Sequence, residues 1–367
     1  MTVRRRLAAF VVGALVLASC SDDGGPAADE ARIEVDGSVT VVAADGSTGT
    51  LTNDATLDFG DRVTVDAGSA MVELAGGQQY ELRSGPTPSV LEIASPPVLA
   101  SGDVLVVAGF PAQVRLGTTT VSAMGAMKVV SAVPSVVSYA GRARIDGAGR
   151  LDEVVALRQV VLTSSAIAEP LVYDGADEWD RRYLAEAMAF GDRLEALGRG
   201  YTADLGADSV RSASFYEAVI PALGDDREFS ADLLGDRRAG ETIIGASIVV
   251  QGRDDTFRTR WNEVFEFRDE GAAWGLVALD QGVSSAPVLD TVELAVAAPQ
   301  PPSTSTVPST PTSTSRPPVP TTDGSDPGPT TSTPPDPDPT PPTTGLLDPI
   351  ADPVAAILED LLGIIGL

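Results

Sequence analysis

Short strand patterns separated by turn residues fill residues 31–167 and constrain the fold more than any other feature of the chain. The stretch GDRVTVDAGSAMVELAGG at residues 60–77 shows the repeated unit: strand, turn, strand, turn. Frequent turns without a helical period are typical of an antiparallel sandwich, barrel or stacked roll. We therefore predict an all-β sandwich or roll over residues 31–167, with strands at 39–42, 62–65, 71–74, 80–82, 104–107, 128–130 and 143–145.

An ordered series of motifs within this stretch resembles the FecR domain, across residues 37–162. GDRVTV at 60–65 and GSAMVEL at 68–74 are followed by a Gly-Gly turn at 76–77, ASGDV at 100–104, VSAMGAMKV at 121–129 and YAGRARI at 139–145. The resemblance implies a non-enzymatic all-β module outside the cytoplasm, of the kind that often couples an envelope receptor to a sigma-factor circuit. The chain departs from the regulator pattern because it has no spanning helix and no cytoplasmic segment. It also has MGAM at 124–127, where the family usually has Gly-Thr and an aromatic residue.

Residues 168–298 are expected to form a small α+β domain, with helices first and a sheet after. Apolar residues recur at spacings of three and four from Trp179 to Leu197, which predicts an amphipathic helix capped by Asp177 and closed near Gly198 or Gly200. A second helix is expected over 210–220, strands over 242–250 and 257–267, and a hairpin through the turn at 269–271 into 274–279.

The N-terminus has the layout of an export signal followed by a lipidation site. Three arginines precede an apolar run at 7–18 that is too short to span a bilayer, and Leu-Ala-Ser-Cys at 17–20 resembles the lipobox of bacterial lipoproteins. Cys20 is the only cysteine in the chain, and the alternative is a thiol that merely ends a soluble signal peptide. We expect residues 1–19 to be a signal peptide, and the acylated Cys20 with the tether at 20–30 to hold the chain on the extracytoplasmic face of the cell membrane.

The C-terminal part is expected to be a linker followed by a helix. Residues 299–344 are rich in Pro, Thr and Ser and cannot bury a core, which predicts a disordered linker. Residues 345–367 carry a predicted amphipathic helix whose apolar stripe docks into a groove on another envelope protein; a membrane surface and the chain's own domains are the alternatives. The stripe consists of Val354, Ile357, Leu358, Leu361, Leu362 and Ile365.

The residue types in the chain limit the catalytic and metal-binding sites that it can form. The chain contains no histidine, which excludes Ser-His-Asp and Cys-His catalysis and His-based zinc sites, and we expect no catalytic residue, no cofactor and no metal site. The formal net charge of −27 argues against nucleic acid as a partner. A carboxylate pair is the remaining enzymatic route, although solvated surface charge is the simpler interpretation. Its candidates are Asp225, Asp226, Glu228, Asp232 and Asp236, or Asp254 and Asp255.

Four aromatic residues suit a stacking platform for sugar rings. Their period of two, however, predicts the buried face of a hairpin beneath the 179–197 helix. They are Trp261, Phe265, Phe267 and Trp274.

Taken together, these features predict a non-enzymatic, lipid-anchored envelope protein that acts as a binding, scaffolding or sensory module. One alternative is a cell-wall glycan-binding protein or a carboxylate-dependent glycan hydrolase. Another is signalling through a separate membrane partner.

Replacing Cys20 with Ser removes the only thiol that can carry acyl chains, and we expect the variant to leave the membrane fraction. Cell fractionation and immunoblotting measure this, with a chain that lacks residues 346–367 as the control for the C-terminal helix. A Cys20→Ser chain that still fractionates wholly with membranes, in a detergent-sensitive manner independent of residues 346–367, contradicts the lipid anchor.

Overall fold

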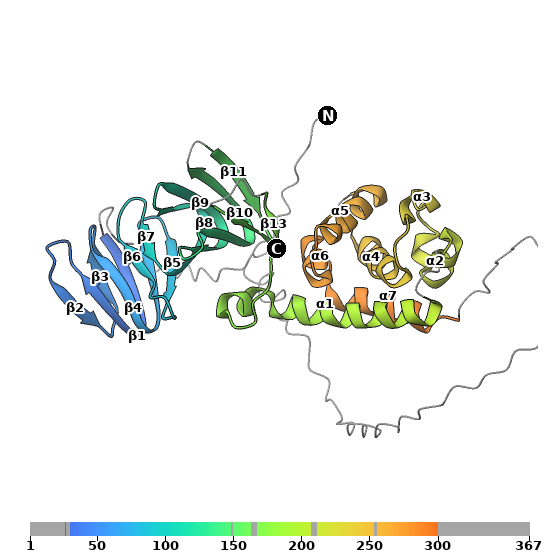
Figure 1. Cartoon of the computed structure of the whole chain (residues 1–367), viewed down its shortest axis with the longest axis horizontal. Helices are drawn as coiled ribbons and strands as arrows, with labels where there is room; N and C mark the ends of the chain where they lie inside the picture. The colour runs from blue at the N-terminus through green and yellow to red at the C-terminus, as the bar shows by residue number, and fades with distance from the viewer. Residues whose placement is uncertain are drawn as a thin grey trace, which may run out of the picture. The chain divides into compact units, whose positions relative to one another are not determined.

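A computed structural model describes residues 26, 30–147, 150–162, 167–206, 211–252 and 255–299. Strands come first along the chain and helices follow (Figure 1). This order confirms the predicted mainly β chain in which a β domain precedes the region with the helices. None of the described helices is both long enough and apolar enough to cross a membrane.

The β domain is a single antiparallel sheet with one parallel contact, between β7 and β8. All seven predicted strand segments lie within strands of this sheet. The strands in the described residues are β1 (Glu30–Val42), β2 (Thr48–Leu51), β3 (Ala55–Asp58), β4 (Arg62–Leu74), β5 (Gln78–Arg83), β6 (Val90–Glu92), β7 (Val98–Ser101), β8 (Asp103–Leu116), β9 (Thr119–Val130), β10 (Ser135–Gly147), β11 (Arg150–Val155), β12 (Arg158–Val161) and β13 (Glu169–Pro170).

Two pairs of facing glycines shape the longest strands. Gly37 on β1 lies opposite Gly68 on β4, and Gly125 on β9 lies opposite Gly141 on β10. All four have positive φ, at +120° and +76° in the first pair and +118° and +78° in the second. A Cβ added to Gly68 or to Gly141 would lie 1.9 Å from a carbonyl oxygen of the partner strand. Each pair sits beside a shift in register, which bends and twists the two strands. Each pair of facing glycines allows two neighbouring strands to approach closely, and the domain uses this arrangement twice. We call each pair a glycine crossing.

The β core is made of alternate residues along the strands. Ile33, Val72, Tyr80, Val106 and Val129 are fully buried, while their neighbours along the strands are partly exposed or face the other side. This alternation is the period of two that the sequence shows, and it lets one face of each strand join a common apolar cluster.

The second region is built from helices that pack on a long first helix (Figure 1). α1 runs beneath α4, α6 and α7 and shares one apolar core with them. The elements are α1 (Glu178–Leu205), α2 (Ala213–Val219), the 3₁₀ turn η1 (Pro221–Leu223), α3 (Ala231–Leu234), α4 (Ala239–Gln251), α5 (Phe257–Asp269), α6 (Trp274–Asp280) and α7 (Ser285–Ala297).

The strands predicted over 242–250, 257–267 and 274–279 are wrong, because these residues form α4, α5 and α6. Nearly every residue of α4 is buried, and a helix that is apolar on all sides shows no 3.6-residue period. In α5 the alternating aromatic residues also fall at helical spacing, which places Phe257, Trp261 and Phe265 on one buried face. Among the described residues of 168–298, the only strand is the two-residue β13.

The first helix also ends later than predicted. α1 passes through Gly198 and Gly200 and ends at Leu205, with Gly206 as its C-cap. Gly198 lies against Gly240 of α4, where an added Cβ on Gly240 would lie 1.9 Å from the Gly198 carbonyl oxygen. The glycine therefore marks a close approach of two helices and not a helix end.

Replacing Gly141 with Ala tests the steric role of the glycine crossings. Gly76 has a similar positive φ of +88° but nothing within 4 Å of an added Cβ, so Gly76→Ala is the matched control. The control is expected to lower the free energy of unfolding by about 1–2 kcal/mol, the cost of the left-handed conformation alone. Gly141→Ala should cost more, because the Met124 carbonyl must also move. Equal losses in urea denaturation would contradict the crossing as a steric constraint.

Candidate functional site

Three neighbouring strands carry a row of unlike side chains toward the helices. Glu81 on β5 pairs with Leu105 on β8, and Leu105 pairs with Lys128 on β9. Cross-strand partners point to the same face, so the row presents an acid, an apolar group and a base side by side. All three residues are buried. Leu105 belongs to the apolar core of the helices, whereas its chain neighbours belong to the β core. We call these three residues the charged row.

Lys128 binds the first turn of α1 through two carboxylates. Its Nζ donates to Asp177 Oδ2 at 2.7 Å and to Asp180 Oδ1 at 3.0 Å. The hydroxyl of Tyr139 also donates to Asp180, and so does the Asp174 backbone N–H at 2.8 Å. Burial disfavours the charged amine, but the hydrogen bonds and charges of Asp177 and Asp180 outweigh it and raise the pKa of Lys128. The ammonium group therefore stays charged beneath the helix.

Glu81 binds the same turn of α1 from the other end of the row. Arg182 donates to both of its oxygens, at 2.6 and 3.0 Å, and Trp179 Nε1 donates at 3.0 Å. Arg83 lies 2.6 Å away on the same strand. Burial opposes ionisation, but the hydrogen bonds from Arg182 and Trp179 and the charge of Arg83 hold the pKa of Glu81 below its ordinary value of 4.5. Its stabilising contribution is therefore present above that pH and is lost as the pH falls through the lowered pKa.

Asp177 caps the helix that these contacts hold. Its Oδ1 accepts from the backbone N–H groups of Trp179 at 2.8 Å and Asp180 at 3.2 Å. The predicted N-cap is thus confirmed, and the same carboxylate also accepts from Lys128. Both ionisable groups of the charged row are bound to residues at the start of α1, so this site fixes α1 on the sheet.

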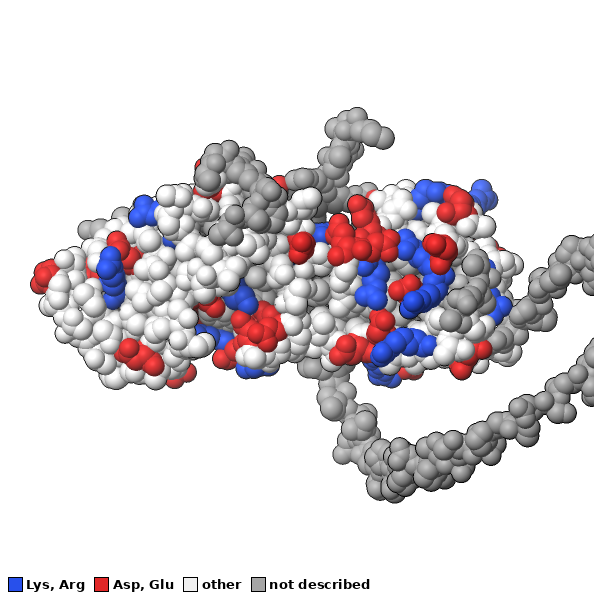
Figure 2. All heavy atoms as spheres, in the orientation of Figure 1, with Lys and Arg blue, Asp and Glu red and all other residues white. Residues whose placement is uncertain are grey.

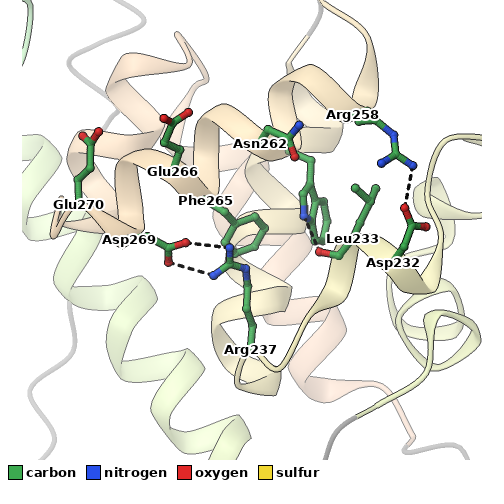
Figure 3. A pocket seen from close by; sticks show the side chains of 10 residues that line it. Asp232, Leu233, Arg237, Arg258, Asn262, Phe265, Glu266, Asp269 and Glu270 are labelled. Atoms are coloured by element: carbon green, nitrogen blue, oxygen red, sulfur yellow. Dashed lines mark hydrogen bonds and ion pairs between the residues drawn. The ribbon is translucent and has the colours of Figure 1, made fainter.

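A groove runs along α5 (Figure 3). It has a volume of about 750 Å³ and combines an aromatic floor with charged walls. Trp261 lies at the base of the groove. Its side chain is buried, and its Nε1 donates a hydrogen bond to the Leu233 carbonyl oxygen at 2.9 Å. The lining residues of the groove are Asp232, Leu233, Arg237, Arg258, Trp261, Asn262, Phe265, Glu266, Asp269 and Glu270. We call it the α5 groove.

Both arginines of the α5 groove are already neutralised by carboxylates. Arg237 donates to both oxygens of Asp269, at 3.0 and 2.9 Å, and its guanidinium lies 4.3 Å above the centre of the Phe265 ring. Arg258 donates to Asp232 at 3.1 Å. Hydrogen bonds from Ser230 and from Arg258 lower the pKa of Asp232, which keeps this carboxylate ionised. The arginines therefore leave little positive charge for an incoming anion.

Glu266 remains open on the wall of the α5 groove. It is exposed and makes no side-chain hydrogen bond or ion pair with any residue that the structure describes. Glu270 pairs with Arg158 of β12. In Figure 3, Glu266 and Glu270 extend from α5 away from Arg237. With four carboxylates and two guanidinium groups, the lining residues carry a formal charge of −2. In Figure 2, charges of both signs gather over the helices.

Two of the carboxylates that the sequence offered for catalysis are bound by one arginine. Asp232 lines the α5 groove, and Glu228 accepts from the Arg258 backbone N–H at 2.9 Å, so both carboxylates are occupied by the same arginine residue. Asp254 lies outside the described residues. No three carboxylates in the described ranges converge closely enough to hold a metal ion.

The aromatic stacking platform is contradicted by burial. Trp261, Phe265, Phe267 and Trp274 are at most 3% exposed, as their alternative interpretation as core residues predicts, although they lie on helices and not on a hairpin. Cys20 and the C-terminal stripe from Val354 to Ile365 lie outside the described residues. Sequence reasoning missed the charged row; its one visible signal is that Lys128 is the only lysine in the chain.

No protein-family model matches this chain, and no curated protein matches it significantly. Two crystal structures of a candidate anti-sigma factor from Parabacteroides distasonis are similar to part of it. The structure at 2.50 Å resolution is 16% identical with a TM-score of 0.25. The structure at 1.65 Å resolution is 17% identical with a TM-score of 0.26. Each comparison covers 30% of this chain and 59% of the solved chain, so the similarity extends over a fraction of both.

Replacing Lys128 with Met leaves the Asp180 carboxylate buried without its cation. We expect the free energy of unfolding to fall by about 3–5 kcal/mol, the usual cost of breaking a buried ion pair from one side. Arg62→Met is the control, because Arg62 and Glu92 form an exposed pair whose loss should cost at most about 1 kcal/mol. Asp180→Asn in the Lys128→Met background should restore part of the loss. Urea denaturation measures all four chains, and a Lys128→Met loss no larger than that of the control contradicts the role of the charged row.

Proposed function

We propose that this chain is a non-enzymatic binding and scaffolding protein of the cell envelope, and that the α5 groove receives a basic side chain of a partner protein. The observation that carries the proposal is the combination, in one groove, of an open carboxylate and a negative charge balance. Pockets that bind ligands are typically concave and apolar with a few placed polar groups.

Arg237 supports a guanidinium or ammonium group as the ligand. Its own guanidinium rests on Phe265 and is held by Asp269, so the groove already accommodates this chemistry. In the same groove, Glu266 and the side-chain amide of Asn262 offer oxygen acceptors that no described residue occupies. A second guanidinium bound there donates a charge-assisted hydrogen bond to the Glu266 carboxylate.

The charged row supports a scaffold over an enzyme. Its two ionisable groups hold α1 on the sheet and are bound to side chains at the start of that helix, which leaves neither of them as a free base or nucleophile. Two carboxylates offered for the glycan hydrolase alternative, Asp232 and Glu228, both bind Arg258, which argues against that alternative.

The envelope location rests on the sequence. Most of the motifs that resemble the FecR domain lie on β4, β9 and β10, where they include Gly68, Gly125 and Gly141 of the two glycine crossings. We propose a FecR-like β domain that is anchored through acylated Cys20 outside the cytoplasm and presents the α5 groove to other envelope proteins. A sensory role through a separate membrane partner uses the same surface.

Glu266→Arg tests the α5 groove directly. The probe is a tetra-arginine peptide, with a tetra-citrulline peptide of the same shape and no charge as its control, titrated calorimetrically into the purified full chain at low salt. We expect Glu266→Arg to weaken binding by about tenfold and the citrulline peptide to bind weakly to every chain. Asp290→Arg, at an exposed position of α7, makes the same change in net charge away from the groove and should have little effect.

Two results would count against the groove as the site. Equal weakening by Glu266→Arg and Asp290→Arg would mean that the net charge of the chain attracts the peptide without a site. Equal binding of the arginine and citrulline peptides would exclude charge as the basis of recognition.

A further inference from the structure

A second hollow lies in the β domain, where connecting turns meet the strands β5 and β8. Its volume is about 290 Å³. Phe59 comes from the β3–β4 turn, Gln78 from the start of β5, Ser95 from the β6–β7 connection and Gln113 from β8. The other lining residues are Leu74, Ala75, Ala94, Pro96, Pro97 and Pro111. We call it the β-turn pocket.

The β-turn pocket is electrically neutral. None of its lining residues is ionisable, although the chain as a whole carries a formal charge of −27. The hydroxyl of Tyr80, close to the wall, is also neutral because burial raises its pKa. Figure 2 shows few charged side chains on the visible face of the strands. A charged ligand finds no counter-charge there, and a neutral ligand with hydrogen-bonding groups is the better match.

The amide side chains in the pocket have spare hydrogen-bonding capacity. The Tyr80 hydroxyl lies 3.0 Å from Gln78 Oε1 and 2.9 Å from the Gln113 carbonyl oxygen. One hydroxyl has one proton, so it satisfies one of these two acceptors at a time. The Gln113 side chain is exposed, and its Nε2 donates to Ser122 at 3.3 Å. Its Oε1 and the amide nitrogen of Gln78 are left for a ligand, since no described residue binds them.

An exposed aromatic residue directly precedes, in the sequence, a residue that lines the pocket. Phe110 is 73% exposed and is the only exposed aromatic residue in the described ranges. It lies on a bulge of β8, where residues 109–111 sit opposite the single residue Met124 of β9. The bulge turns three consecutive residues outward, and the last of them, Pro111, lines the β-turn pocket. Bulges commonly re-aim side chains beside functional sites.

We propose that the β-turn pocket binds a neutral sugar ring of a glycan. The apolar face of the ring packs on Phe110, and its hydroxyl groups exchange hydrogen bonds with Gln78 and Gln113. A volume at the lower end of the range for ligand pockets fits one ring, with the rest of the glycan outside. This site lies in the β domain, and it uses no residue of the α5 groove. The β-turn pocket, and not the buried aromatic residues of α5 and α6, is therefore the proposed glycan site.

The test titrates the full chain with chitotriose, a neutral trimer of N-acetylglucosamine, and follows backbone amide shifts by NMR. We expect saturable shifts at the β-turn pocket and a loss of affinity of about tenfold in Phe110→Ala. Leu294→Ala, which removes an equally exposed apolar side chain from α7, should bind like the natural chain. Phe110→Tyr keeps the ring and should retain binding, and Glu266→Arg should leave it unchanged.

Four results would overturn the proposal: no saturable binding, equal affinity in Phe110→Ala and Leu294→Ala, binding only of the charged trimer of glucosamine, or shifts at this pocket from a proline-rich peptide and none from chitotriose. Because Glu266 plays no part here, failure of this experiment is distinguishable from failure of the α5 groove.

Discussion

The charged row is the interaction on which the described structure depends. Glu81 and Lys128 are separated by Leu105 on the sheet, and the first turn of α1 matches them with Trp179 and Arg182 on one side and Asp177 and Asp180 on the other. Each buried charge has a partner of opposite sign, which is the condition under which charges are tolerated inside a protein. Because α1 also packs on α4, α6 and α7, fixing its first turn fixes the helices that surround it.

The row in turn depends on strand register. A slip of one residue in β8 or β9 would turn Leu105 or Lys128 to the opposite face and replace the polar match with apolar residues. The glycine crossing of Gly125 and Gly141 sits three residues before Lys128 on β9 and permits only one close approach of β9 and β10. The same device at Gly37 and Gly68 sets β1 against β4. Small residues of the β domain thus determine where its few buried charges lie. The strands and helices positioned in this way carry the two proposed binding sites.

How much the sequence predicts depends on how local the signal is. Alternation and turn residues predict the strands correctly, and Asp177 is recognisable as a cap because capping involves residues two and three positions away. The sequence pattern does not identify α4, because a helix that is buried on all sides shows no 3.6-residue hydrophobic period. It does not identify α5, because the spacing of Phe257, Trp261 and Phe265 fits both a strand and a helix. The α5 groove needs those helices and the loop that carries Arg237, so no local pattern foretells it. Lys128 is conspicuous as the only lysine, yet its partners lie 49 and 52 residues away. Only pairing of whole strands and docking of α1 brings them together.

Native-state hydrogen exchange tests the coupling of sheet and helices most directly. The amides of Leu105 in β8 and Leu184 in α1 are both buried, and they report on the two regions joined by the charged row. If the row makes them one cooperative unit, both amides exchange through the same opening, with equal free energies and equal dependence on denaturant. If Leu184 exchanges through a smaller opening of lower free energy, while Leu105 exchanges with the free energy of global unfolding, the helices unfold independently of the sheet. That result would contradict the claim that the charged row joins the two regions into one cooperative unit.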